Sequence, residues 1–112
     1  AIKNSIFQKS AKNVAVIISD TFGRPWREGA INIAIGSSGI EPLVDYRGEF
    51  DPDGRQLEST TIAIVDEIAA ASELVTHKLG RVPVSIVRGY SYAPSEHGIQ
   101  AIIRDSTKDL FR

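Results

Sequence analysis

The stretch from residue 19 to residue 29 carries the side chains best suited to chemistry in this sequence. Asp20 and Thr21 directly follow an apolar run, and ligands of open α/β sheets gather beyond the carboxyl ends of the strands. A carboxylate beside a hydroxyl suits Mg²⁺, which takes one or two carboxylates together with phosphate oxygens. Arg24 and Arg27 follow, and arginine forks match phosphate oxygens. The stretch predicts a metal–phosphate site; the alternative is that Asp20 and Thr21 cap a turn and both arginines pair with local acids.

A second set of candidate residues lies on the strongest helical segment and just beyond it. Asp66, Glu73 and His77 share one helix face, where they could bind a metal or shuttle protons, unless the face is simply solvated. The segment that ends this helix combines cations, a hydroxyl and a glycine, so it could enclose a phosphate or form an ordinary helix cap. Its residues are Thr76, His77, Lys78, Leu79, Gly80 and Arg81. Their spacing is not that of a Walker loop.

The elements that must position these residues include several short strands. Continuous apolar, β-branched runs predict them, and Val14–Ile18 is typical of a strand covered on both faces. The strongest turn signal is Asp51-Pro52-Asp53-Gly54, where glycine allows a positive φ. The expected strands are Val14–Ile18, Ala30–Ile35, Leu43–Tyr46 and Val84–Val87.

Helices are expected at both ends of the chain and in its middle. The predicted helices are Ile2–Ala11, Thr60–Leu79 and a short one within the tail Ile99–Arg112. Ser59 or Thr60 would cap the long helix and Gly80 would end it in a left-handed conformation, while Ser106 or Thr107 would cap the tail helix. The buried stripe of the long helix is expected to contain Ile64, Val65, Ile68, Ser72 and Val75. The pattern predicts an α+β or mixed α/β fold, with a mixed sheet packed against one long helix and shorter helices, in a single domain spanning residues 1–112.

Composition narrows the class of protein. The 112 residues are 42% hydrophobic and 24% charged, which excludes a disordered chain, and the absence of Cys excludes disulfides. The net charge of −1 argues against a generic nucleic-acid binder. Acids are concentrated in the middle third and bases at both ends. The longest apolar run falls far short of the roughly 20 residues of a membrane span, so a soluble, cytoplasmic protein without membrane or nucleic-acid partners is expected.

Several motifs resemble the coenzyme F420-0:γ-glutamyl ligase family. The most specific is the eleven-residue stretch 19–29, Ser-Asp-Thr-Phe-Gly-Arg-Pro-Trp-Arg-Glu-Gly. The others, in the family's order and spacing, are Ala34-Ile35-Gly36 with Gly39, Asp45-Tyr46-Arg47-Gly48, Asp66-Glu67-Ile68-Ala69-Ala70-Ala71 and Val87-Arg88-Gly89. Together these motifs extend over most of the chain.

The resemblance implies an enzyme of deazaflavin coenzyme biosynthesis. Such a ligase joins L-glutamate to the coenzyme F420 precursor through amide and γ-glutamyl linkages, driven by GTP with Mg²⁺ or Mn²⁺, through an acyl phosphate. It implies a homodimer as well. The alternatives are a non-catalytic nucleotide- or metal-binding or assembly domain derived from this scaffold, and a metal-dependent phosphate-ester hydrolase, which the same cations and arginines could serve.

The resemblance also implies roles for individual residues. Asp20 and Thr21 match the metal-binding pair, the segment 76–81 matches the GTP loop, and Arg24 and Arg27 would stabilise phosphate and transition-state charge. The sequence departs from the family at His77-Lys78, where some members carry a metal-ligand carboxylate. Because the family's N-terminal motifs have no counterpart here, the chain resembles the C-terminal part of the ligase domain and is expected to be inactive alone.

Overall fold

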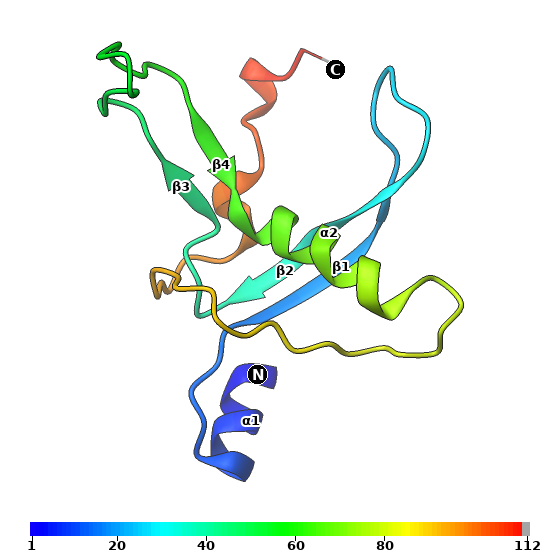
Figure 1. Cartoon of the computed structure of the whole chain (residues 1–112). Helices are drawn as coiled ribbons and strands as arrows, with labels where there is room; N and C mark the ends of the chain where they lie inside the picture. The colour runs from blue at the N-terminus through cyan, green and yellow to red at the C-terminus, as the bar shows by residue number, and fades with distance from the viewer. Residues whose placement is uncertain (111–112) are drawn as a thin grey trace.

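A computed structural model describes residues 1–110 of the chain, and two antiparallel hairpins, two α-helices and two short 3₁₀ helices make up its regular structure. Figure 1 shows α2 lying across the hairpin of β1 and β2, with the hairpin of β3 and β4 extending away from it. The elements in chain order are α1 (Ile2–Ser10), β1 (Val16–Phe22), β2 (Ile31–Ser38), β3 (Leu43–Asp45), β4 (Thr61–Ala63), α2 (Ile64–Thr76), η1 (Ile99–Ile102) and η2 (Ser106–Lys108).

The first hairpin differs from the expected buried strand. β1 pairs antiparallel with β2, and the register shifts between Ile18 and Ser19. β1 begins at Val16 and continues to Phe22, so Asp20 and Thr21 lie within the strand and not in a loop after it. The prediction of a strand covered on both faces was wrong, because Ile18 and Phe22 are about half exposed.

The helix α2 is shorter than its apolar pattern predicts. The residues before Ile64 pair as β4 with β3, and this pairing removes them from the helix. Ala63 occupies the N-cap position without a side-chain hydrogen bond, so the predicted cap at Ser59 or Thr60 was wrong. The buried stripe is confirmed for Val65, which is fully buried, but Val75 is 75% exposed.

The end of α2 also differs from the prediction. The helix stops at Thr76, and the C-cap residue His77 takes the positive φ that was expected at Gly80. Gly80 is required for a different reason: a Cβ there would collide with the backbone oxygen of Thr76. The glycine therefore allows the chain to fold back against the helix end.

The core is small and lies where α2 meets β2. Its buried members are Ala34, Ile40 and Val65, and partly buried side chains from β1, α2 and η1 pack around them. The radius of gyration is 16.0 Å, compared with about 13 Å for a compact domain of this length. α1 has no buried residue, although its position confirms the predicted first helix. The chain is therefore open and leaves much apolar surface exposed.

The remaining predictions had mixed outcomes. The turn at Asp51–Gly54 is confirmed, with the Gly54 N–H donating to the Asp51 carbonyl at 3.0 Å. Residues 84–87 form no strand and stay exposed. The tail contains two 3₁₀ helices, and Asp105 provides the cap that was expected at Ser106 or Thr107; residues 111 and 112 lie outside the described part.

The fold class is α+β, which is one of the two fold classes that the sequence predicts. The predicted mixed sheet was wrong, because both sheets in residues 1–110 are two-stranded and antiparallel. Residues 84–87, which were predicted as a strand, join neither sheet. Within the described chain, no helix is long and apolar enough to cross a membrane.

Candidate functional site: a polar cluster between the first hairpin and the end of α2

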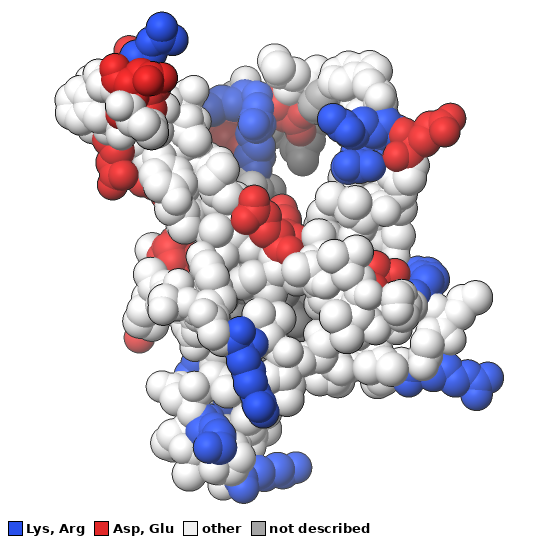
Figure 2. All heavy atoms as spheres, in the orientation of Figure 1, with Lys and Arg blue, Asp and Glu red and all other residues white. Residues whose placement is uncertain are grey.

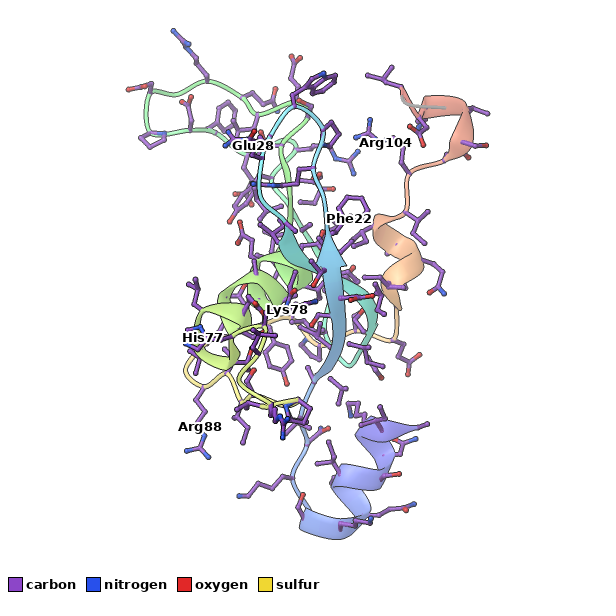
Figure 3. The ribbon with its side chains drawn as sticks, turned by 90° about the vertical axis from the view of Figure 1, so that its right-hand side faces the viewer. Phe22, Glu28, His77, Lys78, Arg88 and Arg104 are labelled. Atoms are coloured by element: carbon purple, nitrogen blue, oxygen red, sulfur yellow. The ribbon has the colours of Figure 1, made fainter. Side chains whose placement is uncertain are left out.

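One contact brings together the two segments in which the sequence predicts ligand binding. The Lys78 Nζ donates a hydrogen bond to the Thr21 Oγ1 at 2.9 Å, across 57 positions of sequence. Lys78 follows the end of α2, and Thr21 lies near the end of β1. Figure 3 shows Lys78 directed toward the hairpin, whereas His77 and Arg88 point away from it. The fold thus places an ammonium group beside a strand hydroxyl.

Two further side chains extend this contact into a connected row. Asn32 is the β2 partner of Thr21, and the Thr21 Oγ1 lies 3.5 Å from the Asn32 Oδ1. The Asn32 Nδ2 donates to the Glu73 Oε2 at 3.2 Å. The row therefore runs from Lys78 through Thr21 and Asn32 to Glu73, with a cation at one end and a carboxylate at the other. We call these four residues the polar row.

Asp20 stands beside the polar row without joining it. Its Oδ1 accepts the N–H of Thr21 at 2.7 Å, and its side chain is exposed. Neighbouring residues of a strand point to opposite faces, so the Asp20 carboxylate and the Thr21 hydroxyl have different surroundings. The described residues contain no group of three or more His, Cys, Asp or Glu side chains that could hold a metal ion. A single exposed carboxylate fits Mg²⁺ or Mn²⁺ only where phosphate, water or other protein groups supply the remaining ligands.

The two arginines of the hairpin tip have different surroundings. The Arg24 Nη2 donates to the carbonyl oxygens of Glu28 and Gly29 at 3.2 and 3.3 Å. Its Nε is buried without a hydrogen-bond partner among the described residues. Arg27 is exposed. Arg24 therefore holds the shape of the loop through backbone carbonyls and not, as the alternative interpretation had it, through local acids.

The segment 76–81 lies at the carbonyl end of α2. Thr76 donates its hydroxyl to the Ser72 carbonyl at 3.2 Å, and the five residues after it are exposed. His77 and Arg81 have positive φ values of 58° and 54°. The partial negative charge of a helix C-terminus disfavours a phosphate and favours cations. An anion bound here would therefore depend on the Lys78 and Arg81 side chains.

The proposed helix face of Asp66, Glu73 and His77 does not form one cluster. The Asp66 Oδ1 accepts the backbone N–H of Ala34 at 2.9 Å and so fixes α2 to the edge of β2. Ala34 is 5% exposed, and a buried N–H without a partner is costly. Glu73 turns to Asn32, while His77 is exposed at the helix end.

Sequence reasoning missed Asn32 altogether. An asparagine flanked by Ile31 and Ile33 interrupts a run of apolar strand residues, and this interruption was the available signal. Its partner Glu73 was noticed only as part of a helix face. Neither residue could be connected with Thr21 before the hairpin and α2 were placed together.

Charged side chains are spread over the molecule and do not form one continuous patch on the face seen in Figure 2. Basic side chains gather over α1, and acidic and basic side chains stand together at the far tip of the β3–β4 hairpin. The face seen in Figure 2 therefore shows no broad basic surface.

Comparison with known proteins agrees with the motifs of this site. The family described as F420-0:Gamma-glutamyl ligase matches residues 1–89. A coenzyme F420:L-glutamate ligase of Methanothermobacter thermautotrophicus is 42% identical over 99% of this chain and 45% of its own length. The ligases of Haloarcula marismortui and Methanocaldococcus jannaschii are 41% and 42% identical over 100% and 99% of the chain and 44% and 45% of their own lengths. The chain thus spans less than half of these relatives, and it belongs to the F420-0:gamma-glutamyl ligase family.

Proposed function

We propose that this chain forms part of a GTP-dependent coenzyme F420-0:L-glutamate ligase. It would correspond to the C-terminal part of the ligase domain and act with the remainder of such an enzyme. The substrates would be GTP, L-glutamate and the deazaflavin coenzyme precursor, and the assembly would be a homodimer. The family match and the identity of about 40% to three ligases support this proposal.

The observation that carries the proposal is the contact between Lys78 and Thr21. From residue types alone, the stretch 19–29 predicts a metal–phosphate site and the segment 76–81 could enclose a phosphate or form a helix cap; Lys78 of the second segment lies 2.9 Å from Thr21 of the first. A metal site and a phosphate site must be adjacent in an enzyme that transfers a phosphoryl group, because the metal neutralises the charge of the phosphates. Their meeting supports one shared site.

The proposed reaction has two steps. A carboxylate oxygen of the precursor attacks the γ-phosphorus of GTP, so that GDP leaves and an acyl phosphate forms. The amine of L-glutamate then attacks the acyl carbon, phosphate leaves, and loss of the amine proton gives the amide. Neither step needs a covalent bond to the enzyme, so positioning and charge stabilisation would be the enzyme's main contributions.

The residues of the site would divide this work between them. Lys78 and Arg81 would hold phosphate oxygens within the segment 76–81, and Arg24 and Arg27 would face the transferred phosphoryl group from the hairpin tip. Asp20 would contribute an oxygen ligand to Mg²⁺ or Mn²⁺, which neutralises triphosphate charge when bound. Thr21, which the resemblance pairs with Asp20 as a metal ligand, would instead accept from the Lys78 ammonium in this chain. Lys78 would supply a positive charge where some family members carry a carboxylate.

The proposal is tested on the intact gene product that carries this sequence. We expect GTP-dependent attachment of L-glutamate to F420-0 in the presence of Mn²⁺, detected by mass spectrometry. The variant K78M should weaken GTP binding in calorimetry by about tenfold or more, since a hydrogen bond to a charged group contributes roughly 1.5–3 kcal/mol. The matched control K12M removes an exposed lysine of the N-terminal segment and should leave binding unchanged. Glutamylation without GTP, or equal affinities for both variants, would contradict the proposal.

A non-catalytic assembly domain is the second candidate, and the open shape of the chain favours it. The radius of gyration of 16.0 Å and exposed side chains such as Leu74, Ile86 and Leu79 give the chain a large surface for association. Two measurements separate the candidates. Analytical ultracentrifugation shows whether the 112-residue chain associates, and calorimetry with GTP and Mn²⁺ shows whether the intact gene product binds nucleotide. Stable association without nucleotide binding by the intact gene product would favour the assembly domain.

A further inference from the structure

The direction of each hydrogen bond in the polar row follows from the chemistry of its end groups. A carboxylate oxygen of Glu73 accepts, so the amide nitrogen of Asn32 must face it, as the 3.2 Å contact records. The amide oxygen of Asn32 then faces Thr21 at 3.5 Å. An amide oxygen can only accept, so this contact, which is long for an O–H···O pair, allows one direction only: the Thr21 hydroxyl donates toward Asn32.

At the Lys78 end of the row, this direction leaves the Thr21 hydroxyl oxygen with only its lone pairs to offer. The Thr21 hydroxyl has one proton, and directing it to Asn32 turns the oxygen lone pairs toward Lys78. The Lys78 Nζ lies 2.9 Å away and can only donate. Asn32 and Glu73 are both half-buried. A flipped Asn32 amide would point its oxygen at the Glu73 carboxylate, and half-burial leaves less water to separate the two oxygens.

We propose that Asn32 and Glu73 are positioning residues that fix the Thr21 hydroxyl as an acceptor and thereby hold the Lys78 ammonium at the nucleotide phosphates. Neither residue touches a substrate. The inference rests on the proposed function for its phosphate, while the orientation of Lys78 is a property of the unliganded chain. The two parts can therefore be tested separately.

The first measurement concerns Lys78 without any ligand. In NMR spectra of the intact gene product, a held lysine shows inequivalent ε-methylene protons and a slowly exchanging ammonium group. We expect N32L to abolish both signatures, because leucine offers no acceptor to the Thr21 hydroxyl. The control N13L makes the same change at an asparagine elsewhere, whose Oδ1 accepts from the Lys3 Nζ at 2.7 Å, and should leave the Lys78 signals unchanged.

A reversal of the row provides the rescue. N32D alone keeps an acceptor for Thr21 but removes the donor to Glu73 and places two carboxylates side by side. Their repulsion should move the side chain at position 32 away from Thr21, so we expect N32D to release Lys78. The double variant N32D/E73Q restores the pattern, because the new amide at position 73 donates to the new carboxylate at position 32, which still accepts from Thr21. This double variant should recover the Lys78 signals. Failure of the rescue, or signals unaffected by N32L, would overturn the inference even if GTP binds normally.

The second measurement connects the row with the nucleotide. N32L should weaken GTP binding roughly fivefold, the effect of about one net hydrogen bond, while the apparent KM for L-glutamate stays unchanged. In a K78M background N32L should have no further effect, because a residue that acts only through Lys78 is not additive with its loss. Additive losses would indicate general damage and overturn the inference. Absence of GTP binding in the unmodified protein would instead refute the proposed function, while the Lys78 signals would still decide the orientation.

Discussion

The two hairpins of this chain are held together in opposite ways. In the hairpin of β3 and β4, the stabilising side-chain contacts are local: the Arg47 Nη2 meets the Asp45 Oδ2 at 2.6 Å, and the Asp51 Oδ1 accepts N–H groups two and four residues ahead. In the hairpin of β1 and β2, Arg24 makes local contacts at the tip, but the side-chain contacts of the strands reach α2 and Lys78 just beyond it, across 32 to 57 residues. The first hairpin thus depends on the rest of the fold, and the second largely closes on itself.

The two hairpins therefore depend on the core to different degrees. A local turn can form without the core, because the groups it joins are already neighbours in sequence. The polar row exists only if β2 and α2 pack together, and the small cluster of Ala34, Ile40 and Val65 does that packing. The site should therefore be as stable as this core, whereas the β3–β4 turn should survive its loss.

The largest expected effect comes from removing part of this core. Ile40 is 1% exposed, so I40A should lower the free energy of unfolding by about 3 kcal/mol, from lost burial and the cavity left behind. I86A is the matched control, because it makes the same chemical change at a position that is 75% exposed. Urea unfolding measures both, and similar costs would show that the cluster is not the core.

The same pair of variants tests the contrast between the hairpins. In I40A the Lys78 signals should lose their inequivalence at a urea concentration where the chemical shifts of the turn at residues 51–54 remain native. Simultaneous loss of both sets of signals would mean that the two regions unfold as one unit, and that local and long-range contacts do not give the two hairpins different stabilities.

The contrast also explains what could be predicted from the sequence. The turn at Asp51–Gly54 was predicted correctly because its chemistry lies within four residues: glycine takes the φ of 81° and the aspartate accepts the N–H groups that the turn exposes. The start of α2 was predicted wrongly because pairing of β4 with β3 competes with helix propensity, and propensity is weak against tertiary contacts.

The candidate site also contains parts that could be predicted from the sequence and parts that could not. The segments 19–29 and 76–81 could be chosen from residue types alone, and the contact of Thr21 with Lys78 required the fold. Asn32 was missed because its role depends on a carboxylate 41 positions away. The strand expected at 84–87 failed for a related reason: an apolar run predicts burial only if a partner strand is available, and the described chain provides none.

A smaller effect is expected at the turn of the β3–β4 hairpin. Gly54 has a φ of 81° and nothing near the position of a Cβ, so G54A should cost roughly 1–2 kcal/mol from the left-handed backbone alone. G23A is the control, because Gly23 also has open space but no positive φ; it should be neutral or slightly stabilising. Thermal unfolding gives the order, and shift changes in G54A that extend to Lys78 would contradict the independence of the two hairpins.

The ion pair between Arg47 and Asp45 makes the stability of the β3–β4 hairpin depend on pH. The Arg47 side chain, and then its backbone N–H, hold the pKa of Asp45 at about 2, below its ordinary 3.8. The stabilising contribution of Asp45 is therefore present above pH 3.8 and is lost as pH falls toward 2. R47A should raise this pKa without restoring it fully, because the backbone N–H remains. Carbon NMR of the carboxyl group measures it, and an unchanged pKa would show that Arg47 has no influence in solution.

The smallest effect concerns Glu41, whose partner His97 is distant in sequence but exposed. The His97 Nδ1 lies 3.2 Å from the Glu41 Oε2, and the Ser95 hydroxyl, more than His97, lowers the pKa of Glu41 below 4.5. Its contribution to stability is present above pH 4.5 and lost as pH falls. S95A should therefore raise the pKa of Glu41 more than H97Q does, and both should hardly change unfolding by urea, since exposed ion pairs contribute little. A larger effect of H97Q on stability would show that sequence distance alone, without burial, makes a contact important in this chain.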